Sequence, residues 1–502
     1  METAADTRDV EQQAPSGGGA PVVALVSLGL FMTTLDASIV NIGLPSIARA
    51  FRTPLDGAVE WVVIGYLVVI AGLLLTFGRL SDLVGRRPIW TLGLVVFTIG
   101  SVACGAAPSL GLLIAARALQ GVGGALIFST SAALLSGAVP PTQRGRALGW
   151  GAVAIALGAS AGPTIGGILT EHATWRWIFY VNVPFGIAAI LATWRLLPRS
   201  PGGGAGGLDL RGAFALAIAL AALNLGLSFG QDWGWTSARV LATLGIGIVA
   251  LGAAAFVERR SPHPIVDLRL FRHRVFASAV VSLLCSMLSL FAVGFLLPFY
   301  LEELRGFSTE HAGLLLTPFP LAIMLVAPTA GSLADRFGSR WLAPLALLIT
   351  AAALLFLAQL DADSTTWAMV WRLALAGVGL GLFQAPNTNA LMGAAPASQQ
   401  GMASGVFATT RVTGQALSVA IAGAVFTSFG AAAAGSALIM QHMRAPSASA
   451  AGQLMLESTF LRGLHAALIT CSAFAILGAV AALARGHESP PAGRMTPAHL
   501  EA

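Results

Sequence analysis

Asp36 is the residue of this 502-residue sequence whose surroundings most strongly indicate chemistry. It is the only one of 22 acidic residues that lies well inside an apolar run, where an ionisable group costs a few kcal/mol. At about 1.5 Å per residue, Asp36 lies roughly 13 Å from Pro45 and Arg117 roughly 10 Å from Leu110, so the two share a depth. Burial disfavours a charged carboxylate and a nearby arginine favours it. The pair predicts a site that binds and releases a proton; a buried structural hydrogen bond is the alternative.

Three more polar residues are candidates for a substrate cavity or its outer mouth. Gln120 follows Arg117 by three residues and therefore shares its helix face. Arg411 is a second cation deep in an apolar run, where it either binds anionic groups or braces the packing. Glu302 adds a carboxylate at the end of a run, which can attract a cationic substrate or take up a proton. A solvated charge at a helix end is the alternative for Glu302.

Small residues recur at every fourth position of an apolar run near residues 147–169. The resulting stripe without side chains consists of Gly158, Gly162 and Gly166, and Gly167 follows directly. In lipid, such a face lets two helices approach until their backbones touch. Pro163 removes one backbone donor and is expected to kink the helix, so that neighbouring protein must satisfy the freed carbonyl. The stripe predicts a close contact between two helices; an ordinary, tightly packed membrane helix is the alternative.

Two loops repeat the pattern Gly-x-Leu-x-Asp-x-x-Gly-x-Arg, at residues 78–87 and 331–340. The second glycine of each copy permits a tight backbone turn. The aspartate can accept hydrogen bonds from an arginine or face the N-terminus of a neighbouring helix. The loops predict a conformational latch; a static turn with solvated charges is the alternative. The latch candidates are Gly78, Asp82, Gly85, Arg86, Arg87, Asp335 and Arg340, and Gly338 is the turn glycine of the second copy.

The elements that must position these residues are membrane helices. The chain is 56% hydrophobic and 10% charged, whereas a soluble domain carries about 25% charged residues. Apolar runs of near 20 residues follow one another, each long enough to cross about 30 Å of hydrocarbon. They lie near residues 21–44, 58–80, 89–107, 110–135, 147–169, 177–197, 211–230, 238–257, 276–300, 311–333, 341–360, 367–393, 402–430 and 460–484. The predicted fold is an all-α integral membrane protein with fourteen transmembrane helices.

A second repeat links residues 117–124 to residues 372–381, in the same direction as the loop repeat. Two correlated repeats predict two parallel six-helix halves. The predicted division is a disordered tail at 1–20, a first half at 21–200, two additional helices at 208–260, a second half at 270–486 and a tail at 487–502.

Arginine placement predicts the orientation. Clustered arginines occupy the loops on one side, as in the pair Arg86 and Arg87, and only scattered ones occupy the other. The positive-inside rule places the clustered side and both termini in the cytoplasm. The Ala- and Ser-rich segment 431–458 is then an outer loop, partly helical or loose.

The sequence does not support ATP-driven transport, metal binding, nucleic-acid binding or hydrolase activity. All 28 basic residues are arginine, so there is no P-loop lysine and no sign of ATP-driven transport. The histidines and three cysteines form no metal-binding pattern, and no basic cluster interleaved with aromatics suggests nucleic acid. Residues 158–162 match the hydrolase pattern Gly-x-Ser-x-Gly. They lie in the middle of a membrane run, however, without the strand-turn-helix that a nucleophile needs, and we expect no enzyme.

Several of these stretches resemble one family. Residues 158–167 resemble the fifth-helix signature of antiporters in the major facilitator superfamily. Residues 35–45, which include Asn41, resemble the first-helix signature of its fourteen-spanner drug:proton antiporters. Residues 113–121 and 175–184 are similar to further motifs of that family, so the resemblance covers nearly the whole chain. It adds Asn41 to the cavity candidates and implies two six-helix halves with two extra central helices.

The resemblance implies a secondary active transporter in the bacterial cytoplasmic membrane. We expect it to export small amphiphilic or drug-like molecules in exchange for protons, by alternating access, with no cofactor besides the proton gradient. Its partners are then a small-molecule substrate, protons and the lipid bilayer. A dedicated exporter of one endogenous metabolite or antibiotic is one alternative, and a membrane sensor or scaffold without transport is another. The sequence identifies neither the substrate nor a periplasmic adaptor.

Overall fold

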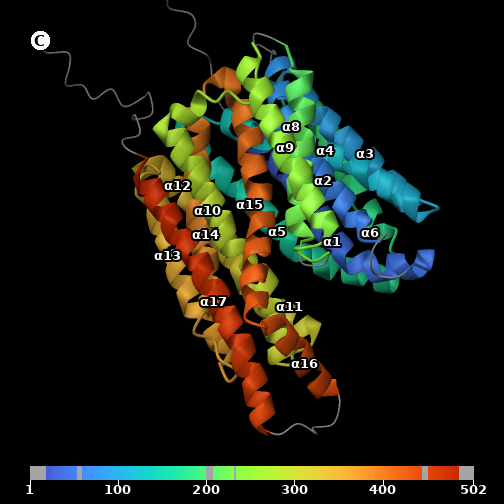
Figure 1. Cartoon of the computed structure of the whole chain (residues 1–502). Coiled ribbons are helices and arrows are strands. Elements are labelled where there is room, and N and C mark those ends of the chain that lie inside the picture. Colours follow the sequence, from blue (N-terminus) through green and yellow to red (C-terminus); the bar gives the residue numbers. More distant parts are fainter. Residues whose placement is uncertain (1–18, 54–58, 199–206, 231–232, 444–449, 486–502) are drawn as a thin grey trace, which may run out of the picture.

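The computed structural model describes residues 19–53, 59–198, 207–230, 233–443 and 450–485. These residues form helices joined by short turns (Figure 1). The first nine are α1 (Gly19–Phe51), α2 (Trp61–Val84), α3 (Arg86–Ala106), α4 (Leu110–Gly137), α5 (Arg144–His172), α6 (Trp177–Tyr180), α7 (Asn182–Leu196), α8 (Leu210–Ser228) and α9 (Ala238–Arg260). The remaining ones are α10 (Arg274–Phe299), α11 (Thr309–Leu316), α12 (Pro318–Phe337), α13 (Leu342–Leu357), α14 (Thr366–Ala394), α15 (Gln400–Ser428), α16 (Ala431–Met443) and α17 (Ala450–Leu483).

Each of the fourteen predicted apolar runs coincides with a helix or a pair of helices. Within the described residues, twelve helical segments are long and apolar enough to cross a membrane. A thirteenth is obtained when α15 and α16, which are bent by 77° relative to each other, count as one span. The apolar helix α13 is shorter, at 16 residues. The structure therefore establishes an all-helical fold with twelve or thirteen candidate spans.

Local sequence explains where several helices begin and break. Helices α4, α8, α9, α11 and α14 begin after a Ser, Thr or Asp whose side chain accepts a backbone hydrogen bond from the first turn. The run near 311–333 divides at Thr317, since Pro318 has no N–H to continue the first helix and instead opens α12. The run near 177–197 also divides, at Val181, and Asn182 becomes the first residue of α7.

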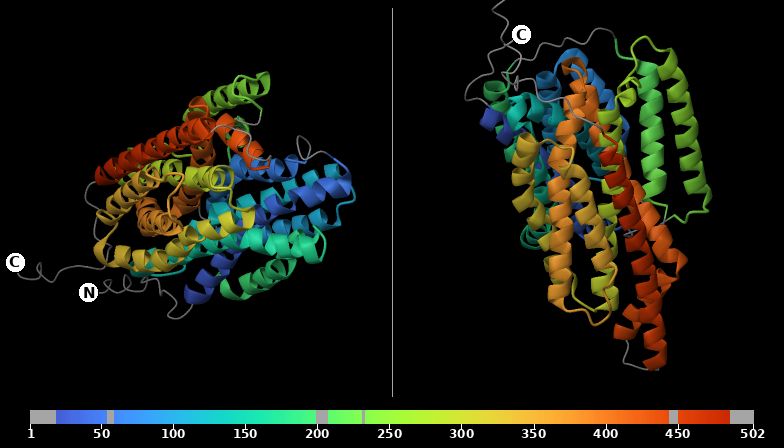
Figure 2. Two further views of the ribbon diagram at one scale, coloured as in Figure 1. Left: turned by 90° about the horizontal axis from the view of Figure 1, so that it is seen from below. Right: turned by 90° about the vertical axis from the view of Figure 1, so that its left-hand side faces the viewer.

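The helices pack as two groups, α1–α7 and α10–α17, with a hairpin of α8 and α9 beside them. In the first group α1 packs on α5, and α4 packs on α2 and α3. In the second group α14 packs on α12 and α13, while α17 packs on α10 and α13. The hairpin contacts α2 and α15, and Figure 2 shows it standing at one side of the bundle.

Two helix pairs form the most extensive contacts between the groups. Helix α5 packs on α12, and α2 packs on α15. We call the end of the bundle where α2 and α12 finish, at Val84 and Phe337, the Asp82 end. At the opposite end α16 and α17 extend beyond the other helices (Figure 1).

Large apolar side chains cover much of the outer surface. Leu325, Val249 and Trp367 are each at least 72% exposed, and they lie on three different helices. A water-soluble protein rarely exposes extensive apolar surface. The distribution suits a bundle surrounded by hydrocarbon.

Candidate functional site

Asp36 lies at the centre of a buried polar cluster. Its Oδ2 accepts a hydrogen bond from Arg117 Nη1 at 2.6 Å, and neither side chain is exposed. Its Oδ1 accepts two more hydrogen bonds, from Gln120 Nε2 and from Asn182 Nδ2, each at 2.8 Å. Three donors from two helices thus converge on one carboxylate, and one of them is a cation. A buried charge requires this kind of complete hydrogen bonding.

Backbone and aromatic groups fix the orientation of Arg117. Its Nε donates to the carbonyl of Val62 at 2.9 Å, and Nη1 also donates to Gln120 Oε1 at 2.6 Å. The guanidinium carbon lies 4.1 Å from the centre of the Tyr66 ring, within the range of a cation–π contact. Arg117 Nη2 has no hydrogen-bond partner among the described residues. The guanidinium is therefore held by α2 and α4 and aimed at α1.

A small residue allows Gln120 to reach this cluster. A side chain on Gly100 of α3 would come within 2.8 Å of the Gln120 Cα, so α3 and α4 cross nearly in contact there. Gln120 Nε2 then also donates to Ser101 Oγ at 2.8 Å. Five helices, α1, α2, α3, α4 and α7, contribute to the cluster around Asp36.

The Asp82 loop contacts the opposite helix group. Asp82 accepts hydrogen bonds from the backbone N–H groups of Gly401 at 2.7 Å and Met402 at 2.8 Å, in the first turn of α15. Of the two alternatives left open by the sequence, an arginine partner or a helix N-terminus, the structure has the second. A carboxylate at a helix N-terminus satisfies unpaired N–H groups and interacts favourably with the helix dipole.

Asp335 makes the equivalent contact in the reverse direction. It accepts hydrogen bonds from the backbone N–H groups of Gly145 at 2.8 Å and Arg146 at 3.0 Å, in the first turn of α5. The first glycine of each loop pattern packs against the helix that the aspartate of that loop contacts. A side chain on Gly78, for example, would come within 2.6 Å of the Gly401 carbonyl oxygen. We call these two contacts the Asp82 clamp and the Asp335 clamp.

The other latch candidates serve the turns or nearby contacts. Gly85 has φ 107° and Gly338 has φ 80°, values that favour glycine, and both end a helix as expected. Arg86 donates to the Ala397 carbonyl oxygen of the second group at 2.9 Å. Arg87 donates to the Trp194 carbonyl oxygen at 3.1 Å within the first group. Arg340 lies over the ring of Trp341, 5.1 Å from its centre.

The glycine stripe of α5 faces α1. A side chain on Gly158 would come within 2.7 Å of the Phe31 carbonyl oxygen, and one on Gly162 would collide with Ser38 Oγ. Ser38 Oγ donates to the Gly158 carbonyl oxygen at 3.0 Å, across the two helices. Gly166 is buried, whereas a side chain on Gly167 would meet nothing within 4 Å. The helix runs without interruption through Pro163.

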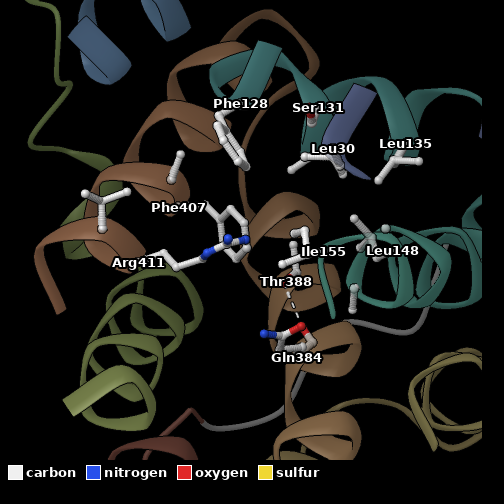
Figure 3. Close-up of a pocket in the computed structure, with 15 residues that line it drawn as sticks. Leu30, Phe128, Ser131, Leu135, Leu148, Ile155, Gln384, Thr388, Phe407 and Arg411 are labelled. Atoms are coloured by element: carbon white, nitrogen blue, oxygen red, sulfur yellow. Dashed lines mark hydrogen bonds between the residues drawn. The ribbon is translucent and has the colours of Figure 1, made fainter. Parts of the chain in front are cut away.

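The remaining cavity candidates lie apart from Asp36. Asn41 is exposed on α1. Glu302 is half-buried in a short π-helical turn, Tyr300–Leu304, that continues α10. Arg411 lines a cavity between the two helix groups (Figure 3). The structure thus brings Gln120 to Asp36 and places the other three candidates elsewhere.

Comparison with known proteins identifies the family. The family model described as Major Facilitator Superfamily matches residues 26–419 and 279–499. The chain belongs to the major facilitator superfamily. Multidrug resistance protein Stp of Mycobacterium tuberculosis (strain CDC 1551 / Oshkosh) is 36% identical over 404 residues, which are 80% of this chain and 75% of Stp. Riboflavin transporter RibZ of Clostridioides difficile (strain 630) is 34% identical over 412 residues, 81% of this chain and 87% of RibZ.

The solved structure of the proton:xylose symporter XylE bound to 6-bromo-6-deoxy-D-glucose shares the fold. Its TM-score is 0.61 at 14% sequence identity, covering 93% of this chain and 95% of that one. As a member of the superfamily, the chain is a multi-pass secondary transporter of a small molecule and not an enzyme. The predicted family is confirmed.

Sequence reasoning misses two features of this superfamily member. Asn182 belongs to one of the family motifs but is not predicted as a site residue, yet it donates directly to Asp36 from a helix 146 positions later. The helix starts that receive the clamps are not predicted either. They carry their own repeat, because residues 140–147 read Pro-Pro-Thr-Gln-Arg-Gly-Arg-Ala and residues 396–403 read Pro-Ala-Ser-Gln-Gln-Gly-Met-Ala. That repeat is a signal available in the sequence.

Proposed function

We propose that the chain exports small amphiphilic or drug-like molecules in exchange for protons, by alternating access. The observation that carries the proposal is the buried contact of 2.6 Å between Asp36 and Arg117. A carboxylate kept at membrane depth by a cation and two amides is a costly arrangement. Coupling to a proton gradient gives such a group a use.

Protonation of Asp36 is the step that links the proton to the helices. A proton on the carboxylate removes the negative charge that faces Arg117, and one oxygen then becomes a donor instead of an acceptor. The hydrogen bonds from Gln120 and Asn182 must then rearrange. Since these donors lie on α4 and α7, a change at α1 alters the packing of several helices together.

The two clamps close one end of the transport path. Each clamp joins helices from opposite groups, so both must open before the groups separate at the Asp82 end. Arginine asymmetry places that end, with both termini, in the cytoplasm. The described conformation is then closed towards the cytoplasm, and release of the clamps admits substrate from inside the cell.

We place fourteen spans in a bacterial cytoplasmic membrane. They are the twelve longer spans, the shorter helix α13, and the bent pair of α15 and α16 counted as one span. The halves at residues 21–200 and 270–486 rock against each other, and the helices within 208–260 stand beside them. Stp, named for multidrug resistance, supports export of drug-like compounds.

A transporter dedicated to one compound is the second candidate, and the relative named riboflavin transporter favours it. A sensor or scaffold without transport would have no evident use for both the Asp36 cluster and the two clamps. Substrate range therefore separates the two transport proposals.

Proton flux in inverted membrane vesicles tests the proposal. Vesicles acidified inside are challenged with chemically diverse compounds, and a transported compound should raise the internal pH as protons leave in exchange. Vesicles with Asp36→Asn provide the control. Responses to many unrelated compounds indicate a multidrug exporter and a response to one indicates a dedicated exporter. If no compound moves protons through the unmodified protein, the proposed antiport is wrong.

A further inference from the structure

The cavity between the helix groups is the strongest unassigned feature of the molecule. It is lined by α1, α4 and α5 of the first group and by α14 and α15 of the second. Figure 3 shows Phe407 and Arg411 of α15 and Phe128 of α4 extending into it. Because both groups contribute walls, a molecule bound there contacts the two parts that must move in alternating access.

Charge in the cavity is one-sided. Arg411 is the only charged residue among the fifteen described residues that line it. It forms no ion pair and no hydrogen bond with the described residues, and it contacts Phe128, whose ring centre lies 5.6 Å from the guanidinium carbon. The carboxylate of Asp36 is not part of the lining and is occupied by Arg117.

The depth of Arg411 increases the effect of its charge. It lies eleven positions after Gln400, the first residue of α15, which corresponds to about 16 Å along the helix and places it near the middle of the membrane. Charges interact more strongly in such surroundings than in water because screening is weak. A cation there attracts anions and repels cations.

The polar side chains around the cavity do not offset that charge. Thr388 Oγ1 donates to the Gln384 carbonyl oxygen at 2.7 Å, and Ser131 Oγ donates to the Ile127 carbonyl oxygen at 2.6 Å. Both hydroxyls thus use their protons within their own helices. The rest of the lining is mainly apolar, with two aromatic rings near the guanidinium.

We propose that the cavity binds an amphiphilic organic anion, with its acidic group paired to Arg411 and its aromatic or apolar body against Phe128 and Phe407. The proposal rests on the transport function above and names its substrate class. A planar carboxylate matches the guanidinium, which presents two parallel donors. Export of an anion also moves negative charge outward, so a membrane potential that is negative inside assists it.

A purely structural role for Arg411 predicts different behaviour. An arginine that braces the packing donates to an acceptor on a neighbouring helix, and Arg411 forms no such hydrogen bond with the described residues. Loss of a structural arginine would weaken the binding of all ligands to a similar extent and would lower the stability of the protein. Loss of an anion-binding arginine instead changes the preference between ligands of different charge.

Binding of charge-matched probes to the purified full chain tests the proposal. Fluorescein, an anionic xanthene dye, is compared with the cationic xanthene dye rhodamine 123 by fluorescence anisotropy. In competition assays, 2-naphthoate is compared with its neutral methyl ester. We expect the unmodified protein to bind fluorescein at least tenfold more tightly than rhodamine 123, and to prefer the acid to the ester.

Variants then assign the preference to one residue. Arg411→Gln should weaken fluorescein binding at least tenfold and leave rhodamine 123 binding unchanged or stronger, while Arg411→Lys should retain part of the anion preference. Arg239→Gln, on the exposed start of α9, changes the net charge equally and should have no effect.

Two outcomes would overturn the inference: equal affinity of the unmodified protein for both dyes, or unchanged fluorescein binding in Arg411→Gln. The first comparison does not depend on any variant folding. Neither outcome affects the antiport proposal, because proton-coupled efflux of rhodamine 123 would still support that function. Saturable fluorescein binding without any proton flux would support the proposed ligand class and contradict the proposed proton antiport.

Discussion

Asp82 and Asp335 form reciprocal contacts between the two helix groups. Each lies near the end of a helix of its own group and accepts two backbone hydrogen bonds, of 2.7–3.0 Å, from the second and third residues of a helix in the other group. A glycine stands at each receiving turn, since a side chain on Gly401 or Gly145 would come within 2.6 or 2.8 Å of the carboxylate oxygen. Both clamps therefore lie at the same end of the bundle.

Asp82→Asn should favour opening at that end. The amide keeps the shape but loses the charge that interacts with the α15 dipole, a loss of about 1–2 kcal/mol for a partly buried site. The ratio of closed to open molecules should fall roughly five- to thirtyfold. Spin labels at Arg195→Cys and Ser332→Cys, in a background without native cysteines, report the distance between the groups. Asp335→Asn should have the same effect.

Asp209→Asn is the matched control for the clamp. Asp209 also accepts backbone hydrogen bonds at a helix start, from Arg211 and Gly212, but that helix is the adjacent α8. The hydrogen bond from the Gly212 N–H lowers the pKa of the Asp209 carboxyl, so the charged form makes the cap. Its loss should leave the distance between the groups unchanged. An equal shift in both variants would show that the clamps have no special role.

The sequence predicts the helices well because each property involved is local. An apolar run and the second glycine of each aspartate loop both act within a few residues. The divisions at Val181 and Thr317 escape prediction because the apolar pattern continues across both. A helix break at one residue leaves the apolar character of the surrounding run unchanged, although Pro318 is a visible sign of the second break.

The site is predictable only in part, because its partners lie far apart in the chain. Equal depth is enough to predict that Asp36 pairs with Arg117, because residues on different helices can be compared by their distance from the same membrane surface. The contact of Asn182 with Asp36 depends on the direction from which α7 approaches α1, and depth does not determine that direction. The partner of Asp82 lies 319 residues away in the other group, and it depends on how the groups meet in this conformation.

Gly162→Leu should abolish transport by separating α1 from α5. The new side chain would collide with Ser38 and with the Ile39 backbone nitrogen, only 3.0 Å from an added Cβ. Over-packing of this kind costs roughly 1–3 kcal/mol, so part of the protein should still reach the membrane. Efflux and surface expression are measured together. Gly167→Leu, five residues later with open space around it, should transport normally.

Cysteine labelling tests the orientation. In a variant lacking Cys104, Cys285 and Cys471, a cysteine at the exposed Ser458 should react with an impermeant reagent on intact cells. A cysteine at the exposed Arg272 should react only after the membrane is breached. The reverse pattern would place the Asp82 end outside and would invert the proposed direction of gating.

Asp36→Asn should abolish proton-driven efflux while leaving substrate binding largely intact. The amide occupies nearly the same volume and can still accept a hydrogen bond from Arg117, but it cannot bind and release a proton. Removing the charge opposite a buried arginine also leaves that cation unpaired, so stability must be measured beside transport. Uphill efflux should disappear, whereas substrate exchange down a gradient can persist.

Glu302→Gln tests whether the coupling proton binds at Asp36 or at Glu302. Glu302 lies in the π-helical turn after α10, away from the Asp36 cluster, and its loss should leave proton coupling intact. The decisive comparison is the pH change in inverted vesicles for the two variants at matched expression. If Asp36→Asn still concentrates substrate against a gradient and Glu302→Gln does not, the coupling proton binds at Glu302. The Asp36 cluster would then be a structural connection among five helices.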